Sequence, residues 1–393
     1  MSLRYSNRMA LLKASEIREL LKLTEQPDII SFAGGLPASE LFPIEKVKEA
    51  TCKVLDEDGK AALQYSTTEG YVPLREIIAK ERMRPAGVDI SYEDIIMING
   101  SQQGLDFSAK IFLNPNDVVI CERPSYLGAI NAFRAYEPRF VEINMDEDGM
   151  IMEELERALI DYPNAKFIYT VPDFQNPTGK TLSIERRRQM VELAFKYNAV
   201  IIEDSPYGEL IFEGERLPAI KSFDKYGVVI YLGTFSKTFC PGLRIGWVCA
   251  RKDILSKYVI VKQGADLQCN SLSQRQAAAF MQANSLDEHI EKIKSVYKKR
   301  RDLMIDTMGK EFPSTCSYTY PLGGLFTWVT LPEGNDTTEV LKLALKEKVA
   351  FVPGCSFFAN GDATNFLRLN YSTMTEKKIV EGIGRLGRVL KQL

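Results

Sequence analysis

Lys237 stands in a short segment whose side chains could hold a phosphorylated aldehyde. Thr234 and Ser236 precede it, and Arg244 follows seven residues later. A lysine amine can form an imine with an aldehyde, while hydroxyls and a guanidinium hold a dianionic phosphate nearby. The apolar run 228–232 predicts a buried strand, so Lys237 should lie just past its carboxyl end, where open α/β sheets bind ligands. A single lysine is far more often a surface residue, so this interpretation needs a second cluster.

That second cluster lies upstream of Lys237, again after strand-like apolar runs. Asn176 follows one such run, and Asp204 and Tyr207 follow the next. A pyridine ring used as an electron sink needs a carboxylate to keep its nitrogen protonated and donors to stabilise its phenolate oxygen. Each segment alone is typical of a turn or a solvated strand end. Together, in this order, they predict one cofactor site.

The order of these motifs resembles that of the fold-type I pyridoxal-phosphate (PLP) aminotransferases of classes I and II, especially the 2-aminoadipate and kynurenine branch. The resemblance implies a PLP enzyme that moves the amino group of an L-amino acid (2-aminoadipate, leucine-like or aromatic) to a 2-oxo acid such as 2-oxoglutarate by a ping-pong mechanism. It covers nearly the whole chain, and the matching segments are 31–37, 64–66, 100–104, 124–126, 176–179, 204–207, 236–244 and 366–370.

By resemblance, Lys237, Asp204 and Tyr126 are catalytic, and the Tyr126 ring stacks on the pyridine. Tyr65 reaches the phosphate of the neighbouring subunit's cofactor, which implies a homodimer with shared active sites. Ser101 and Gln102 open a predicted helix whose free N–H groups suit a phosphate, although a plain strand–helix turn would look the same. The residues expected around the cofactor are Tyr65, Ser101, Gln102, Tyr126, Asn176, Asp204, Tyr207, Thr234, Ser236, Lys237 and Arg244.

The resemblance assigns Gly35, Asn176, Arg368 and Arg18 to the substrate. Arg368 lies in an apolar, strand-like run, where a buried arginine needs a carboxylate partner. That partner is either the substrate α-carboxylate or an internal one, unless the side chain faces solvent. Arg18, on the helix-like segment 15–20, could swing in to meet an acidic side chain or could be a solvated helix residue.

Composition excludes several other functions. Of the 393 residues, 45% are apolar and 26% charged, and the net charge is −2, so we expect neither nucleic-acid nor membrane binding. The N-terminus lacks the apolar core of a signal peptide, which favours a cytoplasmic location. One histidine, His289, and seven cysteines without a CxxC pair argue against a metal centre, a Ser-His-Asp hydrolase and a disulfide framework.

The alternation of strand-like and helical patterns predicts an α/β fold: a large domain with a mostly parallel seven-stranded sheet between helices, and a smaller α/β domain. We expect an N-terminal arm with part of the small domain at 1–48, the large PLP-binding domain at 49–285 and the small domain at 286–393. The strand-like runs of the large domain are 95–98, 118–121, 140–143, 167–171, 200–202, 228–232 and 245–249.

Two other functions fit the same cofactor residues. A β-lyase, decarboxylase or racemase would share the cofactor shell. A ligand-sensing domain of the kind fused to a winged helix would need an N-terminal DNA-binding part, for which we expect no room, because the family's N-terminal segment begins almost at once.

Overall fold

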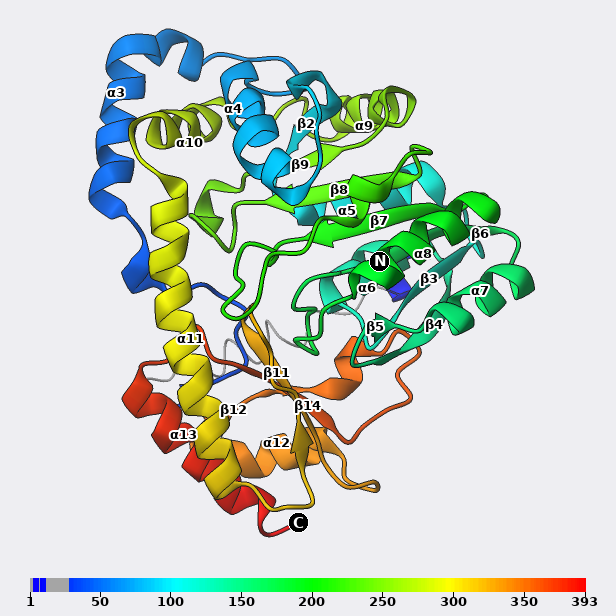
Figure 1. Cartoon of the computed structure of the whole chain (residues 1–393), viewed down its shortest axis with the longest axis vertical. Helices are drawn as coiled ribbons and strands as arrows, with labels where there is room; N and C mark the ends of the chain where they lie inside the picture. The colour runs from blue at the N-terminus through cyan, green and yellow to red at the C-terminus, as the bar shows by residue number, and fades with distance from the viewer. Residues whose placement is uncertain (1–2, 7, 12–27) are drawn as a thin grey trace.

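The structure, a computed structural model, describes residues 3–6, 8–11 and 28–393 of the chain. Its largest element is an eight-stranded sheet with the strand order β2-β9-β8-β7-β6-β3-β4-β5 (Figure 1). The strands are β2 (Ile95–Ile98), β3 (Val118–Arg123), β4 (Arg139–Asp146), β5 (Gly149–Met150), β6 (Ala165–Thr170), β7 (Val200–Ser205), β8 (Val229–Thr234) and β9 (Gly246–Cys249).

This sheet is mostly parallel and confirms the predicted α/β fold. The neighbours β4, β3, β6, β7 and β8 run parallel, and β9 is antiparallel to β8 and β2. Each of the seven strand-like runs forms one of its strands. The eighth strand, β5, was not expected from the sequence, because a two-residue strand that pairs Met150 with Met145 is too short to produce a periodic pattern. Parallel pairing brings the carboxyl ends of β6, β7 and β8 to one edge.

Helices cover both faces of the sheet, each against a separate apolar core. On one face lie α5 (Ser101–Phe112), α6 (Leu127–Arg134) and α9 (Lys252–Ala265), and on the other lie α7 (Met152–Asp161) and α8 (Ile184–Lys196). A third core beside β2 and β9 joins α3 (Ile44–Ala62), α4 (Val72–Ile77) and α10 (Ser271–Ala283).

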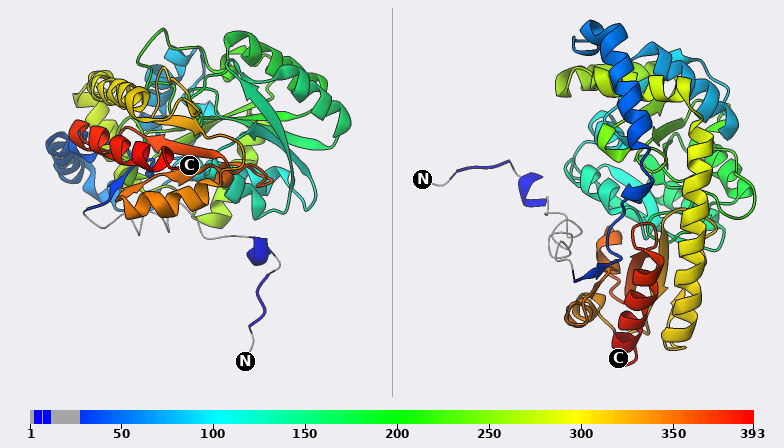
Figure 2. Two further views of the ribbon diagram at one scale, coloured as in Figure 1. Left: turned by 90° about the horizontal axis from the view of Figure 1, so that it is seen from below. Right: turned by 90° about the vertical axis from the view of Figure 1, so that its left-hand side faces the viewer.

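The 26-residue helix α11 (Leu286–Glu311) runs from the large sheet to a smaller α/β unit (Figures 1 and 2). There an antiparallel sheet has the order β10-β11-β14-β13, and β1 pairs with β12. These elements are β1 (Ile30–Ser31), β10 (Ser317–Tyr318), β11 (Phe326–Thr330), β12 (Val349–Ala350), β13 (Val352–Pro353) and β14 (Phe366–Asn370), with the helices α12 (Thr337–Lys346) and α13 (Glu376–Leu390).

The domain limits expected from the sequence remain a proposal. The limit at residue 286 coincides with the start of α11, whereas residue 48 lies inside α3. A four-residue helix, α1 (Arg8–Leu11), is described near the N-terminus. Within the described ranges, no helix is both long enough and apolar enough to cross a membrane.

Candidate active site

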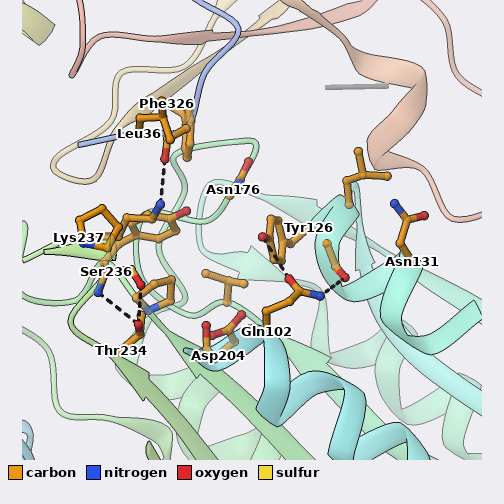
Figure 3. Close-up of a pocket in the computed structure, with 18 of the residues that line it drawn as sticks. Leu36, Gln102, Tyr126, Asn131, Asn176, Asp204, Thr234, Ser236, Lys237 and Phe326 are labelled. Carbon is orange, nitrogen blue, oxygen red and sulfur yellow. Dashed lines mark hydrogen bonds between the residues drawn. The ribbon is translucent and has the colours of Figure 1, made fainter. Parts of the chain in front are cut away.

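A cavity of about 760 Å³ opens at the carboxyl ends of β6, β7 and β8 and is closed on one side by the small unit (Figure 3). Tyr65 is 79% exposed and does not line it. Arg18 and the segment 15–20 lie outside the described residues. The other predicted site residues all line this cavity: Gly35, Ser101, Gln102, Tyr126, Asn176, Asp204, Tyr207, Thr234, Ser236, Lys237, Arg244 and Arg368.

Lys237 follows β8 and extends into the cavity. Its Nζ donates a hydrogen bond of 2.8 Å to the carbonyl oxygen of Gly35, which belongs to a segment 202 positions away (Figure 3). Burial lowers the pKa of the Lys237 amine to about 8, and the positive charges of Arg368 and Arg244 act in the same direction. A substantial fraction of this amine is therefore neutral near physiological pH, the form that attacks an aldehyde and accepts a proton.

Asp204, near the end of β7, is only 2% exposed. Its Oδ2 accepts a hydrogen bond of 3.1 Å from the Tyr169 hydroxyl, whereas its buried Oδ1 has no partner among the described residues. Burial raises the pKa of this carboxyl to about 7. Because burying an unpaired carboxylate oxygen costs free energy, a cationic hydrogen-bond donor within the cavity would stabilise Asp204. The protonated ring nitrogen of a pyridine would be such a donor, so the residues fit PLP.

The phosphate end of the site combines a helix N-terminus with a guanidinium and hydroxyls. Ser101 is the first residue of α5, and Gly100 before it has a φ of 76°. A Cβ atom at Gly100 would come within 2.6 Å of Arg244 Nη2, so glycine is needed for this close approach. Thr234 Oγ1 donates to Ser236 Oγ at 2.9 Å. This set of donors and positive charge suits a phosphate dianion.

Arg368 enters the cavity from β14 of the small unit and is 2% exposed. Nη1 donates to Asn176 Oδ1 at 2.8 Å and Nη2 to the Ala33 carbonyl at 2.7 Å, and both acceptors are neutral. The guanidinium lies 4.2 Å from the Phe326 ring centroid and 5.0 Å from that of Phe357. Burial lowers its pKa to about 10, so it stays positive at neutral pH. An anionic ligand would satisfy this charge.

Tyr126 and Tyr207 form walls of the cavity. The Tyr126 hydroxyl donates to Gln102 Oε1 at 3.4 Å, and Gln102 Nε2 donates to the Gly128 carbonyl at 2.8 Å. The Tyr207 ring packs edge-on against the Phe326 ring, with the two ring centroids 6.0 Å apart. Burial raises the pKa of the Tyr207 phenol, which therefore stays protonated and able to donate at neutral pH.

Several residues of this cavity were missed from the sequence. Leu36, Leu127, Asn131 and Phe326 line it, but three of these side chains are apolar, and Asn131 does not closely follow a strand-like run as Asn176 does. The sequence pattern places the buried Tyr169, which donates to Asp204, only within an apolar strand. Only the hydroxyl in the middle of that run could have signalled a polar partner.

The chain belongs to the aminotransferase class I and II family, which matches residues 27–386. The aromatic-amino-acid aminotransferase 1 of Thermococcus litoralis is 46% identical over 99% of this chain and 94% of its own length.

Two solved structures are similar along nearly their whole length. The kynurenine aminotransferase of Pyrococcus horikoshii, solved with pyridoxamine phosphate (PMP), has a TM-score of 0.95 and 44% identity over 99% of this chain and 97% of its own. The α-aminoadipate aminotransferase of Thermus thermophilus, solved with N-(5'-phosphopyridoxyl)-L-leucine, has a TM-score of 0.91 and 41% identity over the same shares. The chain is therefore a fold-type I aminotransferase, and its cofactor is PLP.

Proposed function

We propose that this aminotransferase moves the amino group of an aromatic, leucine-like or 2-aminoadipate donor to a 2-oxo acid such as 2-oxoglutarate, in two half-reactions of a ping-pong cycle. The observation that carries this proposal is the convergence of Lys237, Asp204 and Arg368 on one cavity. These three residues supply an amine, a buried carboxylate and a buried cation. The named relatives act on substrates of these kinds.

When bound, PLP withdraws electrons from the Cα atom of the amino acid joined to it. Asp204 would keep the ring nitrogen protonated, and Asn176 and Tyr207 would donate to the ring's phenolate oxygen. Arg368 holds the substrate α-carboxylate in a two-point contact. The neutral amine of Lys237 takes the proton from Cα, and its pKa of about 8 suits it to do so near neutral pH.

The residues at the far end of the cavity bind the phosphate in this proposal. The N-terminus of α5, the side-chain hydroxyls and the guanidinium of Arg244 together would neutralise the dianion. Tyr126, beside this group, would stack on the cofactor ring instead. The residues in this set are Ser101, Gln102, Thr234, Ser236 and Arg244.

The charges of the described cavity favour neutral substrate side chains. Its cations are Lys237, Arg244 and Arg368, and each has a role in binding the aldehyde, the phosphate or the α-carboxylate. No described lining cation is left for a second carboxylate. Leu36 and Phe326 instead offer apolar surface to an aromatic or branched side chain. Acidic substrates therefore need a cation from elsewhere, and Arg18 is our candidate.

A panel of donors tests the function. Phenylalanine, kynurenine, leucine and 2-aminoadipate would each be incubated with the holoenzyme and 2-oxoglutarate, and glutamate, ammonia and carbon dioxide measured. We expect glutamate in amounts equal to the oxo acid formed from the donor. Ammonia or carbon dioxide in place of glutamate would instead indicate lyase or decarboxylase chemistry.

The cytoplasmic location expected from the sequence stays a prediction.

The active enzyme in this proposal is a homodimer that shares its sites through Tyr65. Tyr65 and the nearby Leu63 are 79% and 74% exposed, so both side chains are accessible to a partner subunit. Tyr65→Phe should raise the PLP dissociation constant roughly tenfold, because one hydrogen bond to a charged group is lost.

Mixed dimers test whether the site is shared. A Tyr65→Phe chain paired with a Lys237→Ala chain should form one intact site and one doubly defective site, with about half the wild-type activity. Half the activity of the Tyr65→Phe homodimer would instead place both residues in the same chain's site.

A further inference from the structure

Tyr169 is a buried tyrosine beside the cavity but outside its lining, and none of the roles above includes it. It lies in β6, the strand next to β7, and is 0% exposed. Its ring packs edge-on against Phe133, with centroids 5.4 Å apart. Because a phenylalanine could make the same apolar contact, packing does not explain the hydroxyl.

The hydroxyl of Tyr169 has a specific partner in Asp204. Tyr169 pairs in register with Ile202, two positions before Asp204, so both side chains project from the same face of the sheet. The hydroxyl donates to Oδ2 at 3.1 Å, while the buried Oδ1 has no described partner. One oxygen of the carboxylate is thus held in place, and the other is left for the cofactor.

The Tyr169 hydrogen bond also opposes the effect of burial on the charge of Asp204. Burial favours the neutral acid and raises its pKa, whereas Tyr169, Ser101 and Lys237 favour the carboxylate. Glu122 on the neighbouring β3 is a further buried acid, and its interaction with Asp204 is unfavourable when both are ionised. The Tyr169 hydroxyl is therefore a main reason why Asp204 can ionise in this apolar setting.

We infer that Tyr169 is a positioning residue for Asp204: its hydroxyl fixes Oδ2 and leaves Oδ1 to the cofactor's ring nitrogen. This inference rests on the proposed role of Asp204. With the cofactor bound, Oδ1 and the ring nitrogen would share one proton, which would stay on the nitrogen only while the carboxylate is the weaker base. A donor to Oδ2 stabilises the carboxylate, so Tyr169 keeps the proton on the ring and sustains its capacity to accept electrons.

The test is Tyr169→Phe with Tyr258→Phe as a matched control. Tyr258 is also 0% exposed and belongs to the same apolar core, and its hydroxyl bonds to Ser108 at 2.6 Å, away from the cavity. Both substitutions remove one buried hydroxyl and keep the ring. The readouts are the ¹⁵N chemical shift of ring-labelled PLP in the holoenzyme, kcat for one amino donor, and the urea midpoint of the cofactor-free protein.

We expect Tyr169→Phe to move the ¹⁵N shift toward that of unprotonated pyridine and to lower kcat roughly tenfold, the size of one hydrogen bond to a charged group. Tyr258→Phe should lower the urea midpoint but leave the shift and kcat unchanged. If the ¹⁵N shift changed in Asp204→Asn but not in Tyr169→Phe, Tyr169 would be a packing residue only. An unchanged shift in Asp204→Asn as well would overturn the proposed role of Asp204 itself.

Discussion

Arg368→Lys is the substitution that most sharply tests the substrate site, because it keeps the charge and changes only the hydrogen-bonding geometry. Arginine has five N–H donors and lysine three. Arg368 already donates once to Asn176 and once to Ala33. Three donors remain for a ligand in the wild type, and one remains if a lysine serves the same two acceptors. A two-point contact with the α-carboxylate then becomes a one-point contact.

The loss of one hydrogen bond to a charged group costs roughly 1.5–3 kcal/mol, which corresponds to roughly a 10- to 150-fold fall in kcat/KM. Amino acid and oxo acid should lose similar amounts, since both carry the α-carboxylate. Steady-state kcat/KM for phenylalanine and 2-oxoglutarate measures this fall. The half-reaction of 2-phenylethylamine, which has the aromatic ring and no carboxylate, should hardly change between wild type and variant.

Arg301→Lys is the matched control. Arg301 is also fully buried and lies 4.4 Å from the Tyr320 ring centroid, but it is not part of the cavity lining. Its substitution should lower stability and leave kcat/KM unchanged. If Arg368→Lys slowed the reactions of phenylalanine and 2-phenylethylamine by the same factor, or slowed neither, Arg368 would not bind the carboxylate.

Lys237→Ala should abolish turnover, and borohydride should then fix no cofactor to any peptide; a labelled peptide from another lysine would disprove the assignment. Arg18→Ala should raise KM for 2-aminoadipate and 2-oxoglutarate but not for leucine, and an equal effect on all three would remove Arg18 from the site. The cofactor-free protein should lose stability as the pH rises from about 4 to 7. Burial raises the pKa of Asp204, Glu122 and Glu203 to about 7, so the folded state keeps protons that the unfolded chain releases near pH 4. The urea midpoint should fall over this range, and less so in Asp204→Asn; a midpoint that is flat or rises would contradict the burial argument.

Local pattern was sufficient for the large sheet and for one wall of the site. Asn176, Asp204 and Thr234 could be placed together from the sequence because each lies at or just beyond the carboxyl end of a parallel strand, and parallel strands end at one edge. The apolar runs determined those strands through burial alone, which is why each of the predicted runs formed one. The two-residue β5 has no such pattern and was missed.

Contacts between distant segments were decided only by the tertiary structure. The sequence singled out Arg368 as a charged residue in an apolar strand, but not whether it faced an internal carboxylate, solvent or a ligand. In the fold, β14 lies against a loop 192 positions away, where the buried Arg368 lines the cavity and donates to the neutral Asn176. The link from Tyr169 to Asp204 likewise depends on which strands are neighbours and in what register. Periodicity reports that a residue is buried, whereas its partner is set by how the sheets and helices pack.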